Sequence, residues 1–335
     1  MEAARTKVII TGVGGQDGFL MAKHLLKTTS HKIVGVFRSY KSEKYEYFKD
    51  EPNFKLVRSD ISNREHLTTL IKDEQPDYFI NFAGESETQE SWGQPIWCFE
   101  SNVMGVLNCL RVIETFQPAC RFFNAGSSEE FGSPENSPQE INDKPSSRNI
   151  YGASKIAAHE IVKVYREERG LFAVQAVLYG HESSYKSNKF FTKKSCEKLK
   201  EIKDFLAAGL EFKPLQVGNL ESLRDWSCAE NFVKSVWDIM RLPAPKDYIL
   251  ASGYLNSCRD FLDCALEILE IKGEWIEEGF GEYFISNGKI IIETNEEFFR
   301  QKEPVSLCGD CSDAIIDFGF DPECDLKELV GSILK

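Results

Sequence analysis

The stretch Lys7-Val-Ile-Ile-Thr-Gly-Val-Gly-Gly-Gln-Asp-Gly18 decides the fold of this 335-residue chain. It begins as an apolar strand, continues into a loop with glycines at positions 12, 15 and 18, and leads into a helical pattern. Glycines there allow a tight turn and let backbone N–H groups approach a pyrophosphate at the helix N-terminus. A glycine motif alone also fits an ordinary strand–helix turn. The residues that follow favour a dinucleotide-binding loop.

Apolar strands alternate with helical segments through the first half of the chain. The expected strands are Lys7–Thr11, Lys32–Phe37, Phe54–Val57, Asp77–Phe82, Arg121–Ala125 and Phe172–Leu178. Ser62-Asn-Arg-Glu65 has the spacing of a capping box that opens one helix. The alternation predicts an α/β fold with a Rossmann-type, doubly wound parallel sheet, in which ligands bind at the carboxyl ends of the strands.

The pattern changes near residue 180, where a lysine-rich helical stretch and further mixed elements follow. We therefore predict a dinucleotide-binding domain over residues 1–180, to which residues 228–251 return, and a smaller mixed α/β substrate-binding domain over residues 181–335. Residues 133–149 are rich in Pro, Ser and Asn and predict a loop.

Composition limits the possible partners. The net charge of −13 argues against a nucleic-acid partner. No apolar stretch approaches the roughly 20 residues of a membrane span, and no signal peptide precedes the first strand, so we expect a cytoplasmic protein without a membrane partner. Ten scattered cysteines fit reduced thiols, and Cys308-Gly-Asp-Cys311 lacks a second ligand pair, so no metal site is predicted.

The segment Tyr151-Gly-Ala-Ser-Lys155 carries the predicted chemistry. A tyrosine and a lysine at this spacing lie on one face of a helix, where the ammonium can lower the pKa of the phenol and favour its use as a base. Ser127, which follows an expected strand, can hydrogen-bond the same substrate oxygen. Glu129 adds a carboxylate for a second proton transfer, and Ser128 adds a hydroxyl near a leaving group. Together these residues predict hydride transfer followed by elimination.

With these residues the chain resembles the extended short-chain dehydrogenase/reductases that act on nucleotide sugars, and among them the GDP-mannose 4,6-dehydratases. The resemblance runs nearly end to end. The segments that carry it are Thr11-Gly-Val-Gly-Gly-Gln-Asp-Gly18, Ser127-Ser-Glu129, Tyr151-x-x-x-Lys155, His181-Glu-Ser183, Gly218-Asn-Leu-Glu-Ser-Leu-Arg-Asp-Trp226 and Phe298-Phe-Arg300. It implies a homodimer or homotetramer that converts a GDP-hexose, most closely GDP-mannose, to the 4-keto-6-deoxy sugar.

The resemblance also implies roles by position. The expected cofactor-binding residues are Gly12, Gly15, Gln16, Asp17, Gly18, Arg38, Asp60, Ile61, Phe82, Ala83, Gly84, Ser86, Tyr151, Lys155, His181 and Lys186. Arg38 follows the second strand where a 2′-hydroxyl binder has a carboxylate, which favours NADP over NAD. The expected substrate contacts are Ser86, Glu129, Lys194, Arg224 and Arg300, whose cations suit a diphosphate.

Several positions depart from the family pattern and leave the sugar open. Gly180 replaces an asparagine, Ser184-Tyr185-Lys186 replaces Pro-Arg-Arg, Trp97 replaces a tyrosine, and Gly84–Trp92 is more acidic than the family's segment. The alternative function is that of a GDP-sugar C4 dehydrogenase or epimerase, including one that acts on a GDP-heptose or a GDP-N-acetylhexosamine. An epimerase needs the serine, tyrosine and lysine but no second base, so Glu129 separates the two functions.

Overall fold

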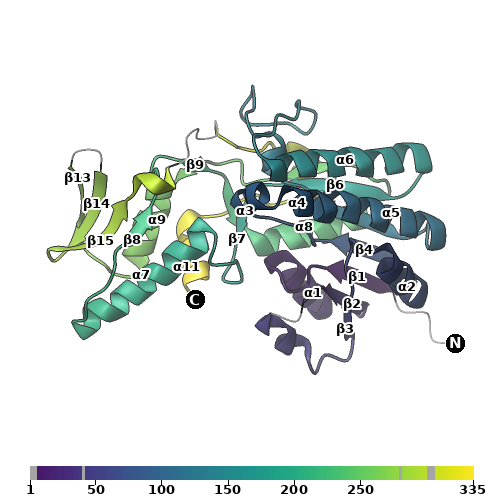
Figure 1. Cartoon of the computed structure of the whole chain (residues 1–335), viewed down its shortest axis with the longest axis horizontal. Helices are drawn as coiled ribbons and strands as arrows, with labels where there is room; N and C mark the ends of the chain where they lie inside the picture. The colour runs from purple at the N-terminus through teal and green to yellow at the C-terminus, as the bar shows by residue number, and fades with distance from the viewer. Residues whose placement is uncertain (1–5, 40–41, 279–280, 300–305) are drawn as a thin grey trace.

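A seven-stranded parallel sheet forms the centre of the larger part of the molecule in the computed structural model of this chain (Figure 1). The structure describes residues 6–39, 42–278, 281–299 and 306–335. The strands are β1 (Lys7–Thr11), β2 (Lys32–Phe37), β3 (Phe54–Arg58), β4 (Tyr78–Asn81), β5 (Arg121–Ala125), β6 (Ala173–Leu178) and β11 (Tyr248–Leu250). Their order is β11-β6-β5-β4-β1-β2-β3, which confirms the Rossmann-type prediction.

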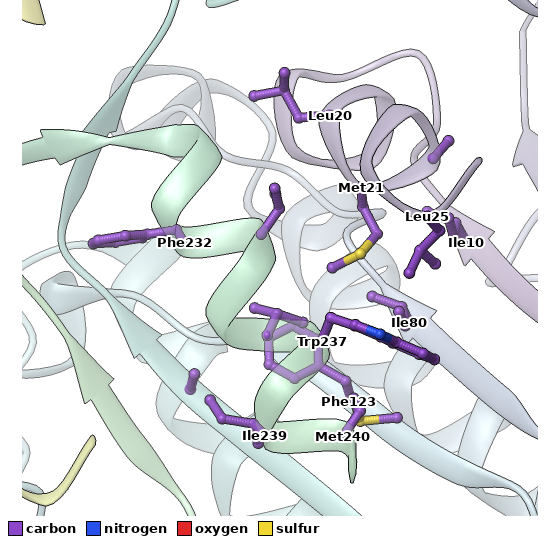
Figure 2. Close-up of a cluster of buried hydrophobic side chains, with 14 of the residues drawn as sticks. Ile10, Leu20, Met21, Leu25, Ile80, Phe123, Phe232, Trp237, Ile239 and Met240 are labelled. Carbon is purple, nitrogen blue, oxygen red and sulfur yellow. The ribbon is translucent and has the colours of Figure 1, made fainter. Parts of the chain in front are cut away.

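The strands are almost wholly apolar because helices cover both faces of the sheet. In β1, Val8 and Ile10 point into one hydrophobic core and Ile9 into another. The first core is closed by α1 (Gln16–Thr28) and α8 (Ala229–Arg241), which contribute Met21, Leu25, Phe232 and Trp237 (Figure 2). The second lies under α2 (Arg64–Glu74), α5 (Gly105–Phe116) and α6 (Ile150–Arg169). Burial on both faces makes the sheet a rigid base for its loops.

The six predicted strands are all present, with ends that differ by at most one residue. The predicted capping box at Ser62 is wrong by one position. Asn63 is the N-cap of α2, and its side chain accepts hydrogen bonds from the backbone N–H groups of Glu65 and His66, both at 3.0 Å. Asparagine caps a helix as well as serine does, so the pattern alone could not separate the two neighbours.

A long apolar helical run crosses one face of the sheet. It comprises α4 (Pro95–Phe99), the π-helical turn η2 (Glu100–Met104) and α5, and it follows α3 (Thr88–Gly93). Within the described residues, Pro95–Phe116 passes a length and hydropathy test for a membrane span, which the sequence analysis did not anticipate. Its most apolar window is 56% buried inside the protein, which is typical of a core helix.

The smaller part of the molecule, on the left in Figure 1, has its own mixed sheet and core. The sheet has the order β13-β14-β15-β8 and is built from β8 (Leu215–Val217), β13 (Glu274–Glu278), β14 (Gly281–Ser286) and β15 (Lys289–Thr294). The helices α7 (Phe191–Ala208), α9 (Cys258–Ile268) and α11 (Leu326–Leu334) pack around this core. The division of the chain into the two predicted domains remains a prediction.

Short elements join the two parts. The pairs are β7 (Gly180–Glu182) with β10 (Trp226–Cys228), and β9 (Leu223–Arg224) with β12 (Asn256–Ser257). The remaining short elements are the 3₁₀ turns η1 (Glu43–Phe48), η3 (Ser128–Glu130) and η4 (Glu296–Phe298) and the helix α10 (Ser312–Phe318). Residues 133–149 contain no helix or strand, as predicted.

Candidate active site

The carboxyl ends of the sheet strands open onto a cavity of about 750 Å³. The order of the strands reverses between β1 and β4, which is where such sheets bind their ligands. Every predicted site residue in the described part of the chain lines this cavity except Lys194. Arg300 lies outside the described residues. The folded chain therefore brings together residues from the glycine loop, from the turn η3, called the catalytic turn below, and from the helix α6.

The glycine loop fits a dinucleotide pyrophosphate. Gly12 has a φ of +69°, and a Cβ at this position would lie 2.8 Å from the backbone carbon of Phe82. A Cβ at Gly18 would collide with the Gly12 carbonyl oxygen. Gly15 is the N-cap of α1 and offers no side-chain cap, so the first N–H groups of this helix are open to an anion. Side chains at these positions would strike the backbone and prevent the tight turn that presents the N–H groups.

Strand β7 holds the start of α1 in place through the side chains of Gln16 and Asp17. His181 Nε2 lies 3.1 Å from Asp17 Oδ1, and Gln16 Nε2 donates to the His181 carbonyl oxygen at 3.1 Å. Burial by itself raises the pKa of Asp17, but His181 and Lys186 outweigh it and hold that pKa well below its usual range. Lys186 Nζ also donates to the His181 carbonyl oxygen, at 2.9 Å. His181 and Lys186 thus fix the loop as well as line the cavity.

Tyr151 and Lys155 lie on the inward face of α6, as their spacing predicts. The exposed fractions of the two residues are only 8% and 9%. Lys155 Nζ donates to the Ala125 carbonyl oxygen at 2.8 Å and lies 5.5 Å from the centroid of the Tyr151 ring. The lysine therefore ties α6 to the end of β5 beside the catalytic turn.

The pKa of Tyr151 is raised in this structure, although the spacing of Tyr151 and Lys155 led us to expect a lowered one. Burial raises the pKa of the phenol far above its ordinary value, and a hydrogen bond with Ser127 offsets this only partly. Burial also disfavours the ammonium and lowers the pKa of Lys155 to about 8. Both groups are held away from water, so desolvation outweighs their attraction.

The two neighbouring glutamates of the catalytic turn point in different directions. The turn is η3, which Ser127 opens with a capping box to Glu130. Glu129 lines the cavity, and its Oε2 accepts a hydrogen bond from Asn149 Nδ2 at 2.7 Å. Glu130 is 2% exposed, and its Oε1 accepts from the Ser127 backbone N–H at 2.9 Å. Glu129 is therefore the carboxylate that can reach a bound ligand.

Asn149 is a site residue that the sequence analysis missed. It is the N-cap of α6, and its Oδ1 accepts from the Gly152 backbone N–H at 2.8 Å while its Nδ2 orients Glu129. The sequence feature that could have identified it is an asparagine, a preferred N-cap residue, directly before the helix that carries Tyr151.

Arg38 lies at the mouth of the cavity beyond β2. Its guanidinium stacks on the Trp97 ring with 4.4 Å between Cζ and the ring centroid. Asp60 and Ile61 line the cavity at the end of β3, and the Asp60 side chain accepts from the Ser62 backbone N–H at 2.9 Å, so this carboxylate is engaged locally. The guanidinium is planar, and its contact with the ring holds the orientation of its N–H groups, which suits a phosphate.

Among the predicted substrate contacts, Arg224 lines the cavity and donates to the Leu223 carbonyl oxygen at 2.8 Å. Lys194 lies on α7 away from the cavity lining, and its Nζ is 4.8 Å from the centroid of the Phe298 ring. The predicted role of Lys194 therefore has no support from the cavity. Lys189, which the prediction did not include, lines the cavity and forms an ion pair with Glu87 at 3.0 Å.

Comparison with known proteins shows the family of this chain. A GDP-mannose 4,6-dehydratase family model matches residues 9–333. A GDP-mannose 4,6-dehydratase of Vibrio cholerae serotype O1 is 29% identical over 97% of this chain and 92% of its own length. Two solved structures share the fold: RMD from Pseudomonas aeruginosa complexed with NADPH (TM-score 0.77, 19% identity, 98% of this chain and 96% of that one), and dTDP-glucose 4,6-dehydratase from Bacillus anthracis in complex with NAD (TM-score 0.79, 16% identity, 98% and 95%). Because the family model spans almost the whole chain, this chain belongs to the GDP-mannose 4,6-dehydratase family.

Proposed function

We propose that this chain is an NADP-dependent GDP-mannose 4,6-dehydratase whose product is the GDP-4-keto-6-deoxy sugar. The observation that carries the proposal is the convergence of Tyr151, Lys155, Ser127 and Glu129 on one cavity beside a glycine loop that fits a pyrophosphate. Family membership and the name of the Vibrio cholerae relative support the same reaction. Assembly as a homodimer or homotetramer, and the cytoplasmic location, remain predictions.

The residues that would hold the dinucleotide are those of the glycine loop, with Arg38 toward a 2′-phosphate and Phe82 to Gly84 in the same cavity lining. The oxidised cofactor would supply a hydride acceptor for C4 that returns the hydride to C6, and a positive charge that lowers the pKa of the buried phenol. The protein provides the proton transfers and the orientation.

In the first step, Tyr151 removes the proton of the C4 hydroxyl as C4 is oxidised to a ketone. The Ser127 hydroxyl shares a hydrogen bond with the phenol and can also hold the substrate oxygen. Lys155, fixed on the Ala125 carbonyl oxygen, keeps an ammonium beside the ring and favours the phenolate when both are charged. This step needs no other base.

In the second step, the C4 ketone makes the neighbouring C5–H acidic, and Glu129 removes that proton. The C5 carbanion expels the C6 hydroxyl, which leaves as water with the proton that Glu129 removed, and Ser128 can hydrogen-bond the leaving oxygen. After C6 has taken the hydride, a proton returns to C5. Asn149 holds Glu129 for this role through a hydrogen bond to Oε2.

The mass of the product tests the proposed function. Wild-type protein incubated with GDP-mannose and NADP⁺ is expected to give a product that has lost one water, with no net change in the cofactor. A product of unchanged mass would indicate an epimerase instead, and net oxidation with accumulation of reduced cofactor would indicate a C4 dehydrogenase. Either of these outcomes would exclude the dehydratase.

The stacked guanidinium of Arg38 predicts the cofactor preference. Calorimetric titration should show tighter binding of NADP⁺ than of NAD⁺, and Arg38→Ala should narrow the gap by roughly 1–3 kcal/mol, as expected for the loss of a charge-assisted hydrogen bond. Arg169→Ala, at an exposed ion pair with Glu114, removes a guanidinium far from the cavity and serves as the control. Equal affinities of the unaltered protein for the two cofactors would show that Arg38 does not read the 2′-phosphate.

A further inference from the structure

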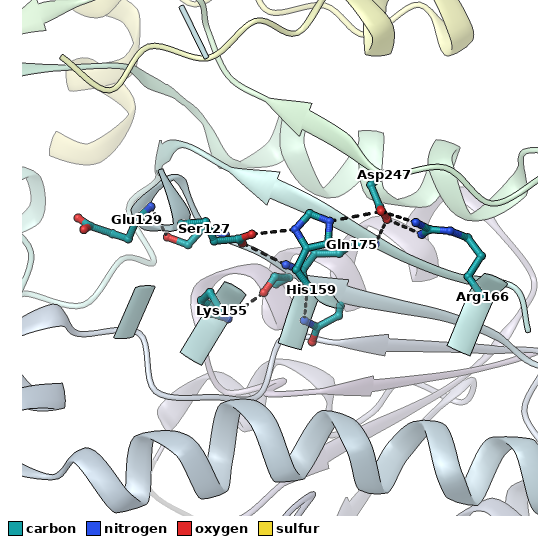
Figure 3. Close-up of polar contacts among 10 residues, drawn as sticks. Ser127, Glu129, Lys155, His159, Arg166, Gln175 and Asp247 are labelled. Atoms are coloured by element: carbon teal, nitrogen blue, oxygen red, sulfur yellow. Dashed lines mark hydrogen bonds and ion pairs between the residues drawn. The ribbon is translucent and has the colours of Figure 1, made fainter. Parts of the chain in front are cut away.

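A buried ion-pair network lies directly behind the catalytic turn, and none of its members is in the proposed reaction. It joins Glu130 of the turn to His159 and Arg166 of α6, and it includes Asp247 at the start of β11 (Figure 3). The exposed fractions of the four side chains lie between 3% and 18%. Burying four ionisable groups is costly unless each is paired, so this arrangement calls for a reason.

The hydrogen bonds of the network require His159 to be an imidazolium. Its Nδ1 lies 2.8 Å from Glu130 Oε2, and its Nε2 lies 3.3 Å from Asp247 Oδ2. A carboxylate only accepts hydrogen bonds, so both ring nitrogens must donate. Arg166 neutralises Asp247 with two further hydrogen bonds, at 2.7 and 2.6 Å. The two carboxylates and two cations thus form a set with no net charge.

Burial disfavours the charged imidazole, but its hydrogen bonds with Asp247 and Glu130 outweigh this effect and raise the pKa of His159 to about 10. The ordinary pKa of histidine is near 6.5, so this contribution to stability is complete below about pH 6.5 and is lost as the pH rises toward 10. The ion pair is therefore intact at neutral pH.

The other oxygen of Glu130 fixes the catalytic turn. Glu130 Oε1 accepts from the Ser127 backbone N–H at 2.9 Å and from Gln175 Nε2 at 3.0 Å. Gly126 leaves room for this contact, since a Cβ there would lie 2.7 Å from the same oxygen. The carboxylate thus links Ser127 to a side chain on α6, the helix that carries Tyr151 and Lys155.

A ladder of buried amides extends the network across the sheet. Gln175 Oε1 accepts from Asn124 Nδ2 at 2.6 Å, Asn124 Oδ1 accepts from Asn81 Nδ2 at 2.8 Å, and Asn81 Oδ1 accepts from the Thr11 hydroxyl at 2.6 Å. These residues are paired neighbours on β6, β5, β4 and β1. A fully satisfied buried network makes a structure rigid. The turn is therefore braced against both α6 and the strand that leads into the glycine loop.

We propose that Glu130 and His159 are positioning residues, whose ion pair holds Ser127 and Glu129 in register with Tyr151 and Lys155 and cancels a negative charge behind the phenol. Neither residue is part of the cavity lining, so each acts through the turn. The inference rests on the proposed function only in that Tyr151 is the base whose protonation sets the acidic side of the pH profile.

Charge at Glu130 also affects Tyr151 directly. Burial makes the largest contribution to the raised pKa of the phenol, the hydrogen bond with Ser127 lowers that pKa, and the charges of Glu129 and Glu130 raise it further. Glu130 in turn faces His159 and Gln175 and raises the pKa of Lys155. Removing the Glu130 carboxylate should therefore make the tyrosine more acidic, whereas removing the His159 imidazolium leaves that carboxylate without its cation and should not.

Two variants with opposite charge effects test this inference. Glu130→Gln keeps an oxygen for Ser127 and Gln175 and lets a neutral His159 donate to Asp247, so its hydrogen bonds can be satisfied. His159→Gln keeps the Glu130 carboxylate but removes its cation. Both should lower kcat by roughly 10- to 100-fold with KM for GDP-mannose unchanged, because misplaced catalytic groups lose rate rather than binding. The acidic limb of the kcat profile should move down by on the order of one pH unit in Glu130→Gln and should not move down in His159→Gln.

The control is Glu74→Gln. Glu74 is another buried glutamate with two cations, Lys7 Nζ at 3.2 Å and Lys55 Nζ at 2.5 Å, at the opposite end of the sheet. It should lose thermal stability but keep the wild-type kcat and pH profile. Wild-type rates and profiles in Glu130→Gln and His159→Gln, or shifts of the same sign in both, would overturn the positioning role. A wild-type protein that does not convert GDP-mannose would instead refute the proposed function, and with it the role of Glu130 and His159 in that reaction.

Discussion

Replacing Tyr151 by phenylalanine is expected to lower kcat by at least about two orders of magnitude, which is the share that general-base catalysis supplies. Phenylalanine keeps the buried ring but has no hydroxyl, so neither Ser127 nor the C4 hydroxyl of the substrate finds its partner. Thermal unfolding and NADP⁺ affinity should stay close to wild type because the phenol makes no other side-chain hydrogen bond that the structure describes. Steady-state kinetics with GDP-mannose measures the effect.

Tyr165→Phe is the matched control because Tyr165 lies on the same helix, α6, but outside the cavity lining. It should keep the wild-type kcat. If Tyr151→Phe turned over GDP-mannose at nearly the wild-type rate, Tyr151 would lose its assigned role and the hydroxyl proton would have to go elsewhere.

Replacing Glu129 by glutamine should separate oxidation from dehydration. Glutamine keeps the shape and can still accept the hydrogen bond from Asn149 Nδ2, but it cannot take the C5 proton. C4 oxidation by Tyr151 should continue, so reduced cofactor should accumulate on addition of GDP-mannose. Release of the 6-deoxy product should fall by at least about two orders of magnitude. Stopped-flow absorbance and product analysis report the two steps separately.

Glu129→Asp retains a carboxylate that is shorter by one methylene and should recover part of the dehydration. Glu135→Gln, at an exposed position of the loop after the turn, should have no effect. Normal dehydration by Glu129→Gln would remove Glu129 as the C5 base and would favour another acid–base group in the cavity.

The sequence predicted most of the central sheet because its strands are continuous apolar runs between helices with clear polar faces. The glycine loop was equally predictable, since each glycine occupies a position where a side chain would strike the backbone. β11 was harder to assign: its three residues follow a long excursion through the smaller part of the chain, and only the fold pairs it with β6.

The catalytic motif identified the residues that line the cavity but not their electrostatic state. The spacing of Tyr151 and Lys155 predicted their shared face correctly, yet it could not reveal that both are almost fully buried, and burial reverses the expected direction of the phenol's pKa shift. Local patterns give neighbours along a helix, whereas desolvation depends on the whole fold.

The ion pair behind the turn was invisible in the sequence for a related reason. Glu130 stands next to Glu129 in the sequence, and His159 is one of five histidines. The two side chains meet because η3 packs against α6. Asp247 lies directly before β11, where the chain returns to the central sheet, and contacts His159 from there. The structure thereby separates a glutamate that faces the ligand from one that holds the turn.

The fate of the C5 hydrogen tests the dehydratase mechanism most directly. Wild-type protein should be incubated with GDP-mannose and NADP⁺ in deuterium oxide, and the product examined by mass spectrometry and NMR. We expect a product that has lost one water and carries one solvent deuterium at C5, because the proton removed by Glu129 is replaced from solvent. A product that retains all its original oxygen, or a dehydrated product with only hydrogen from the substrate at C5, would contradict the mechanism.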